Sequence, residues 1–206
     1  MNFSDRLLEN IRTKKGKIPF ELNHEGVIKN LVFLYHACVA SERLLQEAGN
    51  EALKFSEHEF YKTLSAYYYS HLEEERGEIR ILKEDLATAG VNPLVPDALS
   101  IGMVGTQYYL LKHIDPACLL GYMAVQEADP TPIELVEKLE HLFGKESFRF
   151  LRMHAIKDLE HRKELIALID EAPADFHGAI WFSANNTLGY LMQAATEFYG
   201  KTSHNG

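Results

Sequence analysis

The sequence predicts an all-α protein of about seven helices, and three observations support this prediction. Apolar residues recur at helical spacing in successive segments, as at Leu31, Leu34 and Cys38. Glycine and proline separate these segments, for example at Gly90 and Pro93. No alternation of apolar and polar residues is long enough to indicate a β-strand. Together these features predict a single helical domain over residues 1–206.

The first part of the chain contains helical segments over residues 3–13, 27–48, 55–89 and 97–113. The first of these is charged and amphipathic, and it belongs to an expected N-terminal extension, residues 1–26, before a core of residues 27–200. The third contains Gly77 in its interior. A glycine there costs about 1 kcal/mol relative to alanine, so we expect a local kink or the close approach of another element.

The second part of the chain begins with an apolar run, residues 117–125, that ends just before Glu127. Residues 132–143 follow as a helix with proline at its first position, where the missing N–H costs nothing. A further helix is expected over residues 148–169. The last one, residues 180–199, has a broad apolar face and is expected to be a core element.

Composition narrows the class of protein. A hydrophobic fraction of 46% with 25% charged residues is typical of a globular protein. A net charge of -9 and a pI of about 5.6 argue against nucleic-acid binding. No secretory signal or membrane-spanning run is evident, so a cytoplasmic protein without a membrane partner is expected. Cys38 and Cys118 lie in apolar surroundings and are expected to be buried thiols.

The most informative stretch is residues 148–165, which carries His154, Asp158 and His161 in the pattern H-x3-D-x2-H. At 100° per residue, these three side chains project from one stripe of a helix. Two imidazoles and a carboxylate on one face form half of a transition-metal site and suit iron or manganese. The alternative interpretation is a solvated polar stripe that happens to contain two histidines.

A second stripe lies upstream, where His71, Glu74, Glu75 and Glu78 occur at positions i, i+3, i+4 and i+7. We take His71, Glu75 and Glu78 as the candidate ligands of this stripe. The alternative is a solvated acidic patch whose charge is balanced by Arg76 and Arg80. Glu127 is a further candidate, because a carboxylate that ends so apolar a run needs a hydrogen-bonding partner or a cation.

Taken in order, four motifs resemble one known family. They are H-x2-E-E-x-G-x-I-x2-L-x2-D-L-x3-G over residues 71–90, Q-Y-Y-L over 107–110, L-L-G-Y-M-A-V-x-E over 119–127 and H-x3-D-x2-H over 154–161. Together they resemble the heme-oxygenase-like diiron oxidases and oxygenases, which are related to the TenA/PqqC-type helical fold. The resemblance covers residues 27–200, nearly the whole chain.

This resemblance implies a bundle of seven helices that holds two iron ions, or a manganese–iron pair, in its core. It also implies an O2-dependent oxidase or oxygenase that acts on a small organic molecule. By motif, the ligands carried over are Glu75, Glu127, His154, Asp158 and His161. The family usually has a histidine at position 78, and this chain has Glu78. His71 could supply the missing imidazole, giving a variant set of His71, Glu75, Glu78, Glu127, His154, Asp158 and His161.

Other functions on the same fold stay open at this point. A TenA-like enzyme would need Cys38 or Cys118 as an activated nucleophile, and a PqqC-like oxidase would need no metal. A true heme oxygenase would need a proximal ligand such as His36. Glu78 favours a further alternative, a degenerate member that only binds a ligand. Five tyrosines are expected to line a pocket or to be ordinary helix contacts: Tyr67, Tyr68, Tyr108, Tyr109 and Tyr122. The acidic surface and apolar last helix would permit a homodimer.

Overall fold

The protein is described by a computed structural model that covers residues 1–16, 22–92, 95–128 and 131–199, with the backbone alone at 158–160. Every regular element in these ranges is helical, which confirms the all-α prediction. The described residues form nine α-helices: α1 (Phe3–Lys15), α2 (His24–Leu53), α3 (Glu59–Glu75), α4 (Glu78–Thr88), α5 (Ala98–His113), α6 (Leu119–Glu127), α7 (Ile133–Phe143), α8 (Arg149–Glu171) and α9 (His177–Tyr199). Short 3-10 turns precede α6, α8 and α9.

The predicted helix over residues 55–89 is in fact two helices, and this accounts in part for nine helices where about seven were predicted. α3 ends at Glu75 and α4 begins at Glu78. Between them Gly77 has a φ of 89°, in the left-handed region that favours glycine. A Cβ at this glycine would meet nothing within 4 Å. The glycine therefore permits the break between the two helices, and no close approach of another element requires it.

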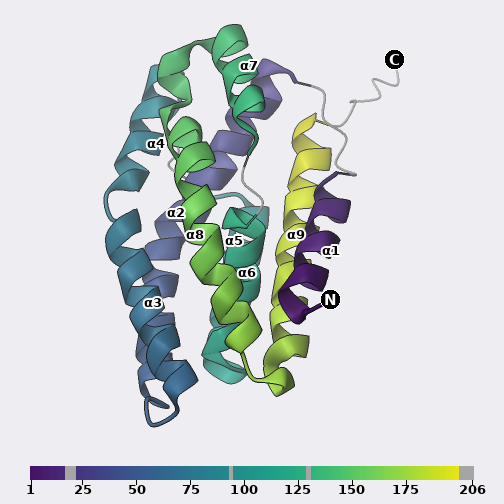
Figure 1. Cartoon of the computed structure of the whole chain (residues 1–206). Coiled ribbons are helices and arrows are strands. Elements are labelled where there is room, and N and C mark those ends of the chain that lie inside the picture. Colours follow the sequence, from purple (N-terminus) through teal and green to yellow (C-terminus); the bar gives the residue numbers. More distant parts are fainter. Residues whose placement is uncertain (17–21, 93–94, 129–130, 200–206) are drawn as a thin grey trace.

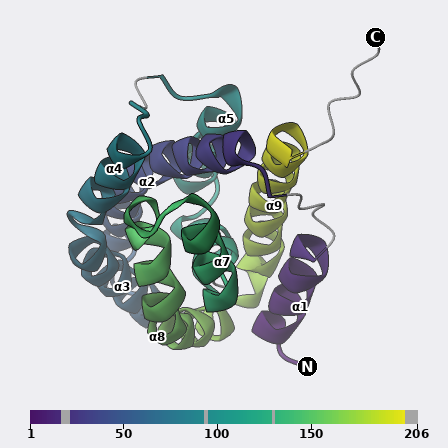
Figure 2. The same cartoon turned by 90° about the horizontal axis from the view of Figure 1, so that it is seen from above.

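The helices form an elongated bundle, seen from the side in Figure 1 and from above in Figure 2. The long α2 packs against α3, α4, α5 and α9, while α6 packs between α8 and α9. α1 lies along α9 at one edge of the bundle, where its Leu7 and Ile11 are fully buried in the main core. The division into an N-terminal extension, residues 1–26, and a core, residues 27–200, stays a prediction. None of the described helices has both the length and the apolar character needed to cross a bilayer.

The short helix α6 is an interior element, since all its side chains from Leu119 to Val125 are buried. It crosses α9 at Gly121, where an added Cβ would overlap the carbonyl oxygen of Ile180 and lie 2.8 Å from the backbone nitrogen of Ala184. Only glycine permits so close an approach of two helix backbones. This crossing sets the position of α6, and therefore that of Glu127 at its C-terminal end.

A buried carboxylate fastens α4 to the start of α8. Asp85 is fully buried and accepts hydrogen bonds from Nε of Arg149 at 2.8 Å and from the backbone N–H of Phe150 at 2.9 Å. Burial raises the pKa of Asp85, although both hydrogen bonds oppose that change. This contact fixes the first turn of α8 against α4 and so orients the histidines further along α8.

Candidate metal centre

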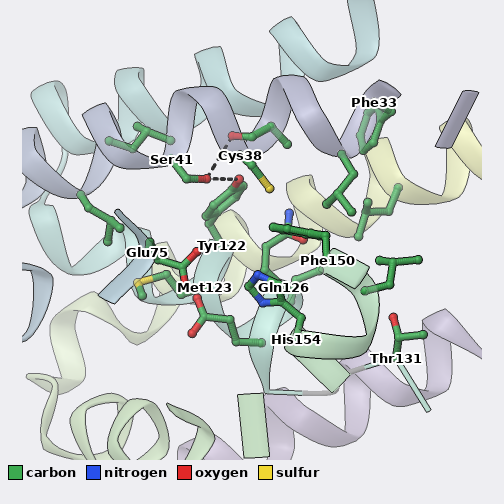
Figure 3. A pocket seen from close by; sticks show the side chains of 18 of the residues that line it. Phe33, Cys38, Ser41, Glu75, Tyr122, Met123, Gln126, Thr131, Phe150 and His154 are labelled. Carbon is green, nitrogen blue, oxygen red and sulfur yellow. Dashed lines mark hydrogen bonds between the residues drawn. The ribbon is translucent and has the colours of Figure 1, made fainter. Parts of the chain in front are cut away.

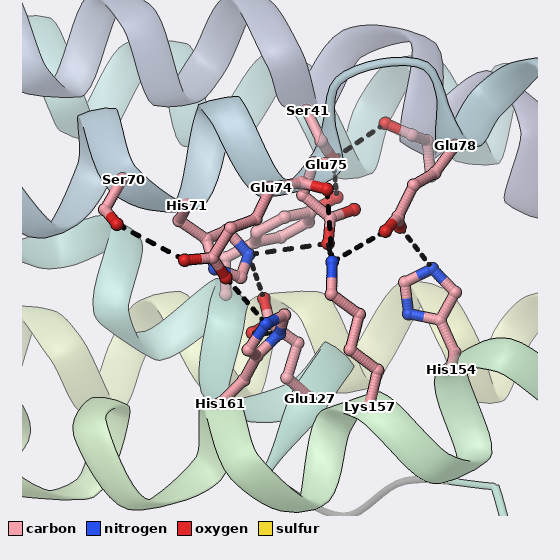
Figure 4. A network of polar contacts seen from close by, with 12 residues as sticks. Ser41, Ser70, His71, Glu74, Glu75, Glu78, Glu127, His154, Lys157 and His161 are labelled. Carbon is pink, nitrogen blue, oxygen red and sulfur yellow. Dashed lines mark hydrogen bonds and ion pairs between the residues drawn. The ribbon is translucent and has the colours of Figure 1, made fainter.

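Six of the seven predicted ligands come together between α3, α4, α6 and α8 (Figure 4). α3 supplies His71 and Glu75, α4 supplies Glu78, α6 supplies Glu127, and α8 supplies His154 and His161. The seventh, Asp158, has a side chain that lies outside the described residues. Residues far apart in the sequence therefore meet at one place in the bundle.

One half of the cluster consists of His71, Glu74, Glu127 and His161, which we call half-site A. Potential ligand atoms of His71, Glu74 and His161 all lie within 4.8 Å of one another. Nε2 of His161 is 2.8 Å from Oε2 of Glu74. Glu127 contacts both histidines, because its Oε1 is 3.2 Å from Nε2 of His71 and its Oε2 is 3.8 Å from Nδ1 of His161.

The other half consists of Glu75, Glu78 and His154, which we call half-site B. Potential ligand atoms of these three residues also lie within 4.8 Å of one another. Nε2 of His154 is 3.1 Å from Oε2 of Glu78. Oε1 of Glu75 lies 3.9 Å from Nε2 of His71, so Glu75 stands at the border between the two halves.

The predicted ligand set did not include two residues of the cluster, Glu74 and Lys157. Glu74 occupies the i+3 position after His71, and this spacing was a usable signal. Lys157 lies one turn after His154 on α8 and places its ammonium among the carboxylates (Figure 4). Its Nζ is 2.6 Å from Oε1 of Glu78, 3.8 Å from Oε1 of Glu75 and 3.1 Å from the backbone carbonyl of Glu74.

The donor atoms of half-site A fit a metal ion. Oε2 of Glu127 and Nδ1 of His161 are buried, and neither has a hydrogen-bond partner among the residues whose side chains the structure describes. Buried polar atoms are rarely left without a partner, because the cost is about 1–3 kcal/mol for each group. A cation between the two atoms would satisfy both. Imidazole and carboxylate together suit iron and manganese.

Burial and neighbouring charges shift the pKa values of several groups in the cluster. Burial raises the pKa of Glu75 to about 7, and the neighbouring carboxylate of Glu78 adds to this rise. For Glu78, burial acts in the same direction, but His154 and Lys157 outweigh it and lower the pKa. For His71, burial lowers the pKa, but the charges of Glu127 and Glu75 outweigh it and raise the pKa overall.

The raised pKa of Glu75 predicts a pH-dependent cost in the metal-free protein. Between about pH 4.5 and pH 7 the folded protein binds a proton at Glu75 that the unfolded chain has lost, so stability falls as the pH rises through this window. Glu75→Gln removes that cost. We expect the variant to be more stable than the parent at pH 8 by on the order of 2 kcal/mol, and equally stable at pH 5.

Urea unfolding in the presence of a chelator, at pH 5 and pH 8, measures this difference. Glu73→Gln, on the exposed side of the same helix, is the matched control, and we expect it to change stability by less than about 0.5 kcal/mol at either pH. A loss of stability in Glu75→Gln at pH 8 would show that the ionised carboxylate is not a burden on the fold.

A cavity of about 250 Å³ adjoins the cluster (Figure 3). Its lining includes four of the candidate ligands, namely His71, Glu75, Glu127 and His154. Elsewhere its lining is largely apolar and includes Phe33, Leu44, Met123 and Phe150. The hydroxyl groups of Ser41 and Tyr122 lie 3.2 Å apart in its wall. A small, mostly apolar molecule bound here would lie directly beside the candidate ligands.

The five tyrosines have different roles in the structure. Tyr122 lines the cavity, and Tyr67 stacks on the ring of His71. Tyr68 is fully buried and donates a hydrogen bond to the carbonyl of Pro116, so it is a packing residue. Tyr108 packs against the main core at half-buried level, and Tyr109 is exposed. Neither of the last two lines the cavity.

The two cysteines differ in exposure: Cys118 is buried as predicted, but the prediction is wrong for Cys38, which is half-buried. Burial raises the pKa of the Cys118 thiol to about 12, and a thiol in that state is a poor nucleophile. Cys38 lies in the cavity wall. His36, the candidate proximal heme ligand, is not among the residues that line the cavity.

Comparisons with known proteins place this architecture. No protein-family model matches the sequence, and no curated protein matches it either. The structure is similar to the crystal structure of a domain of unknown function with a heme oxygenase-like fold from Shewanella denitrificans OS217. The TM-score is 0.71, and the match covers 98% of this chain and 95% of the other. The chain has a heme oxygenase-like fold. At 14% sequence identity, this similarity establishes the fold alone. The activity of the protein must be inferred from the residues of its site.

Proposed function

We propose that the protein is a non-heme iron enzyme that uses O2 to oxidise a small organic molecule at a centre of two metal ions, two irons or a manganese–iron pair. The observation that carries this proposal is the convergence of three imidazoles and four carboxylates beside a largely apolar cavity, with four of these seven groups in its lining. Among its buried donor atoms, Oε2 of Glu127 and Nδ1 of His161 have no hydrogen-bond partner among the described side chains, which supports a cation there.

Each half-site would hold one ion. His71, Glu74, Glu127 and His161 would hold the first, and Glu75, Glu78 and His154 the second, with Asp158 as a further candidate from the sequence. When bound, ferrous ions supply electrons to O2. The carboxylates offset the charge of the ions in a poorly solvated interior. The apolar wall of the cavity excludes water from the reacting groups, and the hydroxyls of Ser41 and Tyr122 can orient a polar group of the substrate.

A second function has one observation in its favour. The ammonium of Lys157 lies 2.6 Å from Oε1 of Glu78, so a positive charge of the protein itself already offsets part of the negative charge of the cluster. A degenerate member of the fold would use such a lysine in place of a metal and keep the cavity for ligand binding alone.

Anaerobic titration with Fe(II) tests the proposal. We expect the protein to retain two ions per chain at saturation, and Mössbauer spectra to change from ferrous to ferric after exposure to O2. His154→Ala is expected to retain one ion, because it removes the single imidazole of half-site B. His141→Ala, at an exposed position of α7, is the matched control and should bind as the parent does. Retention of no iron by the parent would favour the ligand-binding alternative.

A further inference from the structure

We infer that Lys157 is a built-in cation of half-site B and sets the order in which the centre takes up its metals. The first ion binds to half-site A while the ammonium stays in place. The second ion binds to half-site B only after the ammonium has left Glu78. This inference rests on the proposed function, since it assumes a centre that binds metal.

The position of Lys157 is specific. It lies on α8 between His154 and His161, three residues after the first and four before the second, so it shares their helical face. Its side chain is only 27% exposed, and it spans the gap from α8 to the junction of α3 and α4. An ammonium has three N–H donors, and three oxygens of that junction lie within 3.8 Å of Nζ.

The break at Gly77 creates one of these contacts. The last four carbonyls of a helix have no partner within the helix, and Glu74 lies in the last turn of α3. Nζ of Lys157 donates to the carbonyl of Glu74 at 3.1 Å. The C-terminal end of a helix also favours a positive charge. Lys157 therefore serves the end of α3 and the carboxylate of Glu78 together.

The charges of the two half-sites differ as a result. In half-site B the carboxylates of Glu75 and Glu78 face an ammonium. A divalent ion added beside it would leave an excess of positive charge among the described side chains, in a poorly solvated place. In half-site A, the carboxylates of Glu74 and Glu127 form ion pairs only with histidines among the described residues. A divalent ion there would be neutralised by two carboxylates. Half-site A is thus the stronger site for the first ion.

The geometry of the site also allows the ammonium of Lys157 to move away from Glu78. Glu78 begins α4, and the lysine reaches it through a flexible four-carbon stem. Movement of the stem frees Oε1 of Glu78 without any change in the helices. The second ion must compete with the ammonium for this oxygen, so its apparent affinity is lowered by the strength of the ion pair.

Titration of the full chain with Mn(II), followed by electron paramagnetic resonance and by metal analysis, tests the inference. In the parent protein we expect one tightly bound ion and a second bound at least about 10-fold more weakly. In Lys157→Met we expect the second affinity to rise by about 10-fold and the first to stay within about 2-fold of the parent. The second ion should also broaden the Mn(II) signal through the interaction of two neighbouring ions.

Two further variants make the result specific. Lys157→Gln removes the charge but keeps a donor for the carbonyl of Glu74. It should bind the second ion as tightly as Lys157→Met does, and it keeps the test decisive if Lys157→Met folds poorly. Lys163→Met, at an exposed position of α8, is the matched control and should bind as the parent does.

The outcomes separate the two proposals. Equal affinity for both ions in the parent, or an unchanged second affinity in both Lys157 variants, would overturn the role of the lysine and leave the proposed function standing. Absence of any bound ion in the parent and in the variants would overturn the proposed function, and with it this inference.

Discussion

Replacement of Glu127 by alanine is expected to lower the affinity of the centre for its first metal ion by about 100-fold. Glu127 contacts both His71 and His161, at 3.2 Å and 3.8 Å. Its Oε2 is also one of the buried atoms that no described side chain satisfies by a hydrogen bond. The alanine variant removes half of the carboxylate charge that offsets an ion in half-site A.

Competition titrations with Mn(II) or Fe(II) under anaerobic conditions measure this loss. Glu134→Ala, in the exposed first turn of α7, is the matched control for removal of a glutamate and should leave the affinity unchanged. An affinity in Glu127→Ala equal to that of the parent would remove Glu127 from the centre. The burial of Glu127 would then reflect a structural role only.

Gly121→Ala is expected to lower the free energy of unfolding by about 3 kcal/mol. The new Cβ would overlap the carbonyl oxygen of Ile180 and lie 2.8 Å from the backbone nitrogen of Ala184. Both are backbone atoms of α9, so relief requires the two helices to separate. Because α6 carries Glu127, the same separation should weaken metal binding in the fraction of protein that folds.

Urea unfolding of the metal-free protein measures this cost. Gly105→Ala is the matched control, since a Cβ at this helical position meets nothing within 4 Å, and we expect it to be neutral or to stabilise by up to about 1 kcal/mol. Equal stability of the two variants would show that α6 and α9 are free to adjust where they cross.

The helical fold could be predicted because its signals are local. Apolar spacing and glycine or proline boundaries identified most helices to within a few residues. The break at Gly77 could be predicted only in part. A glycine inside a helical pattern indicates either a close approach or a left-handed residue, and the two have the same sequence. Only the positions of the neighbouring elements distinguish them, and these depend on the whole bundle.

The candidate site could be predicted for a similar reason, and to a similar extent. Helical spacing alone pairs His71 with Glu75 and His154 with His161. Glu78 was expected on the same helix as His71, but it lies on α4, beyond the break at Gly77. Lys157 was missed and Glu74 was left out of the ligand set, because which edge of a stripe faces the partner helix depends on how the two helices cross. The arginines proposed to balance the acidic patch illustrate this, since Arg76 pairs with Glu73 and Arg80 with Glu84. A lysine of α8 contacts Glu75 and Glu78 instead. Metal occupancy and the role of Asp158 stay predictions.

The left-handed residue between α3 and α4 has a mechanical consequence for the centre. Glu75 belongs to the end of one rigid rod and Glu78 to the start of another, with a two-residue joint between them. In a continuous helix the separation of two such carboxylates would be set by the pitch. Here a small rotation at the joint changes it without breaking a helical hydrogen bond. The spacing of the two carboxylates is therefore not fixed by the pitch of one helix, and a small movement of α4 against α3 can adjust it to the size of the ion that they hold.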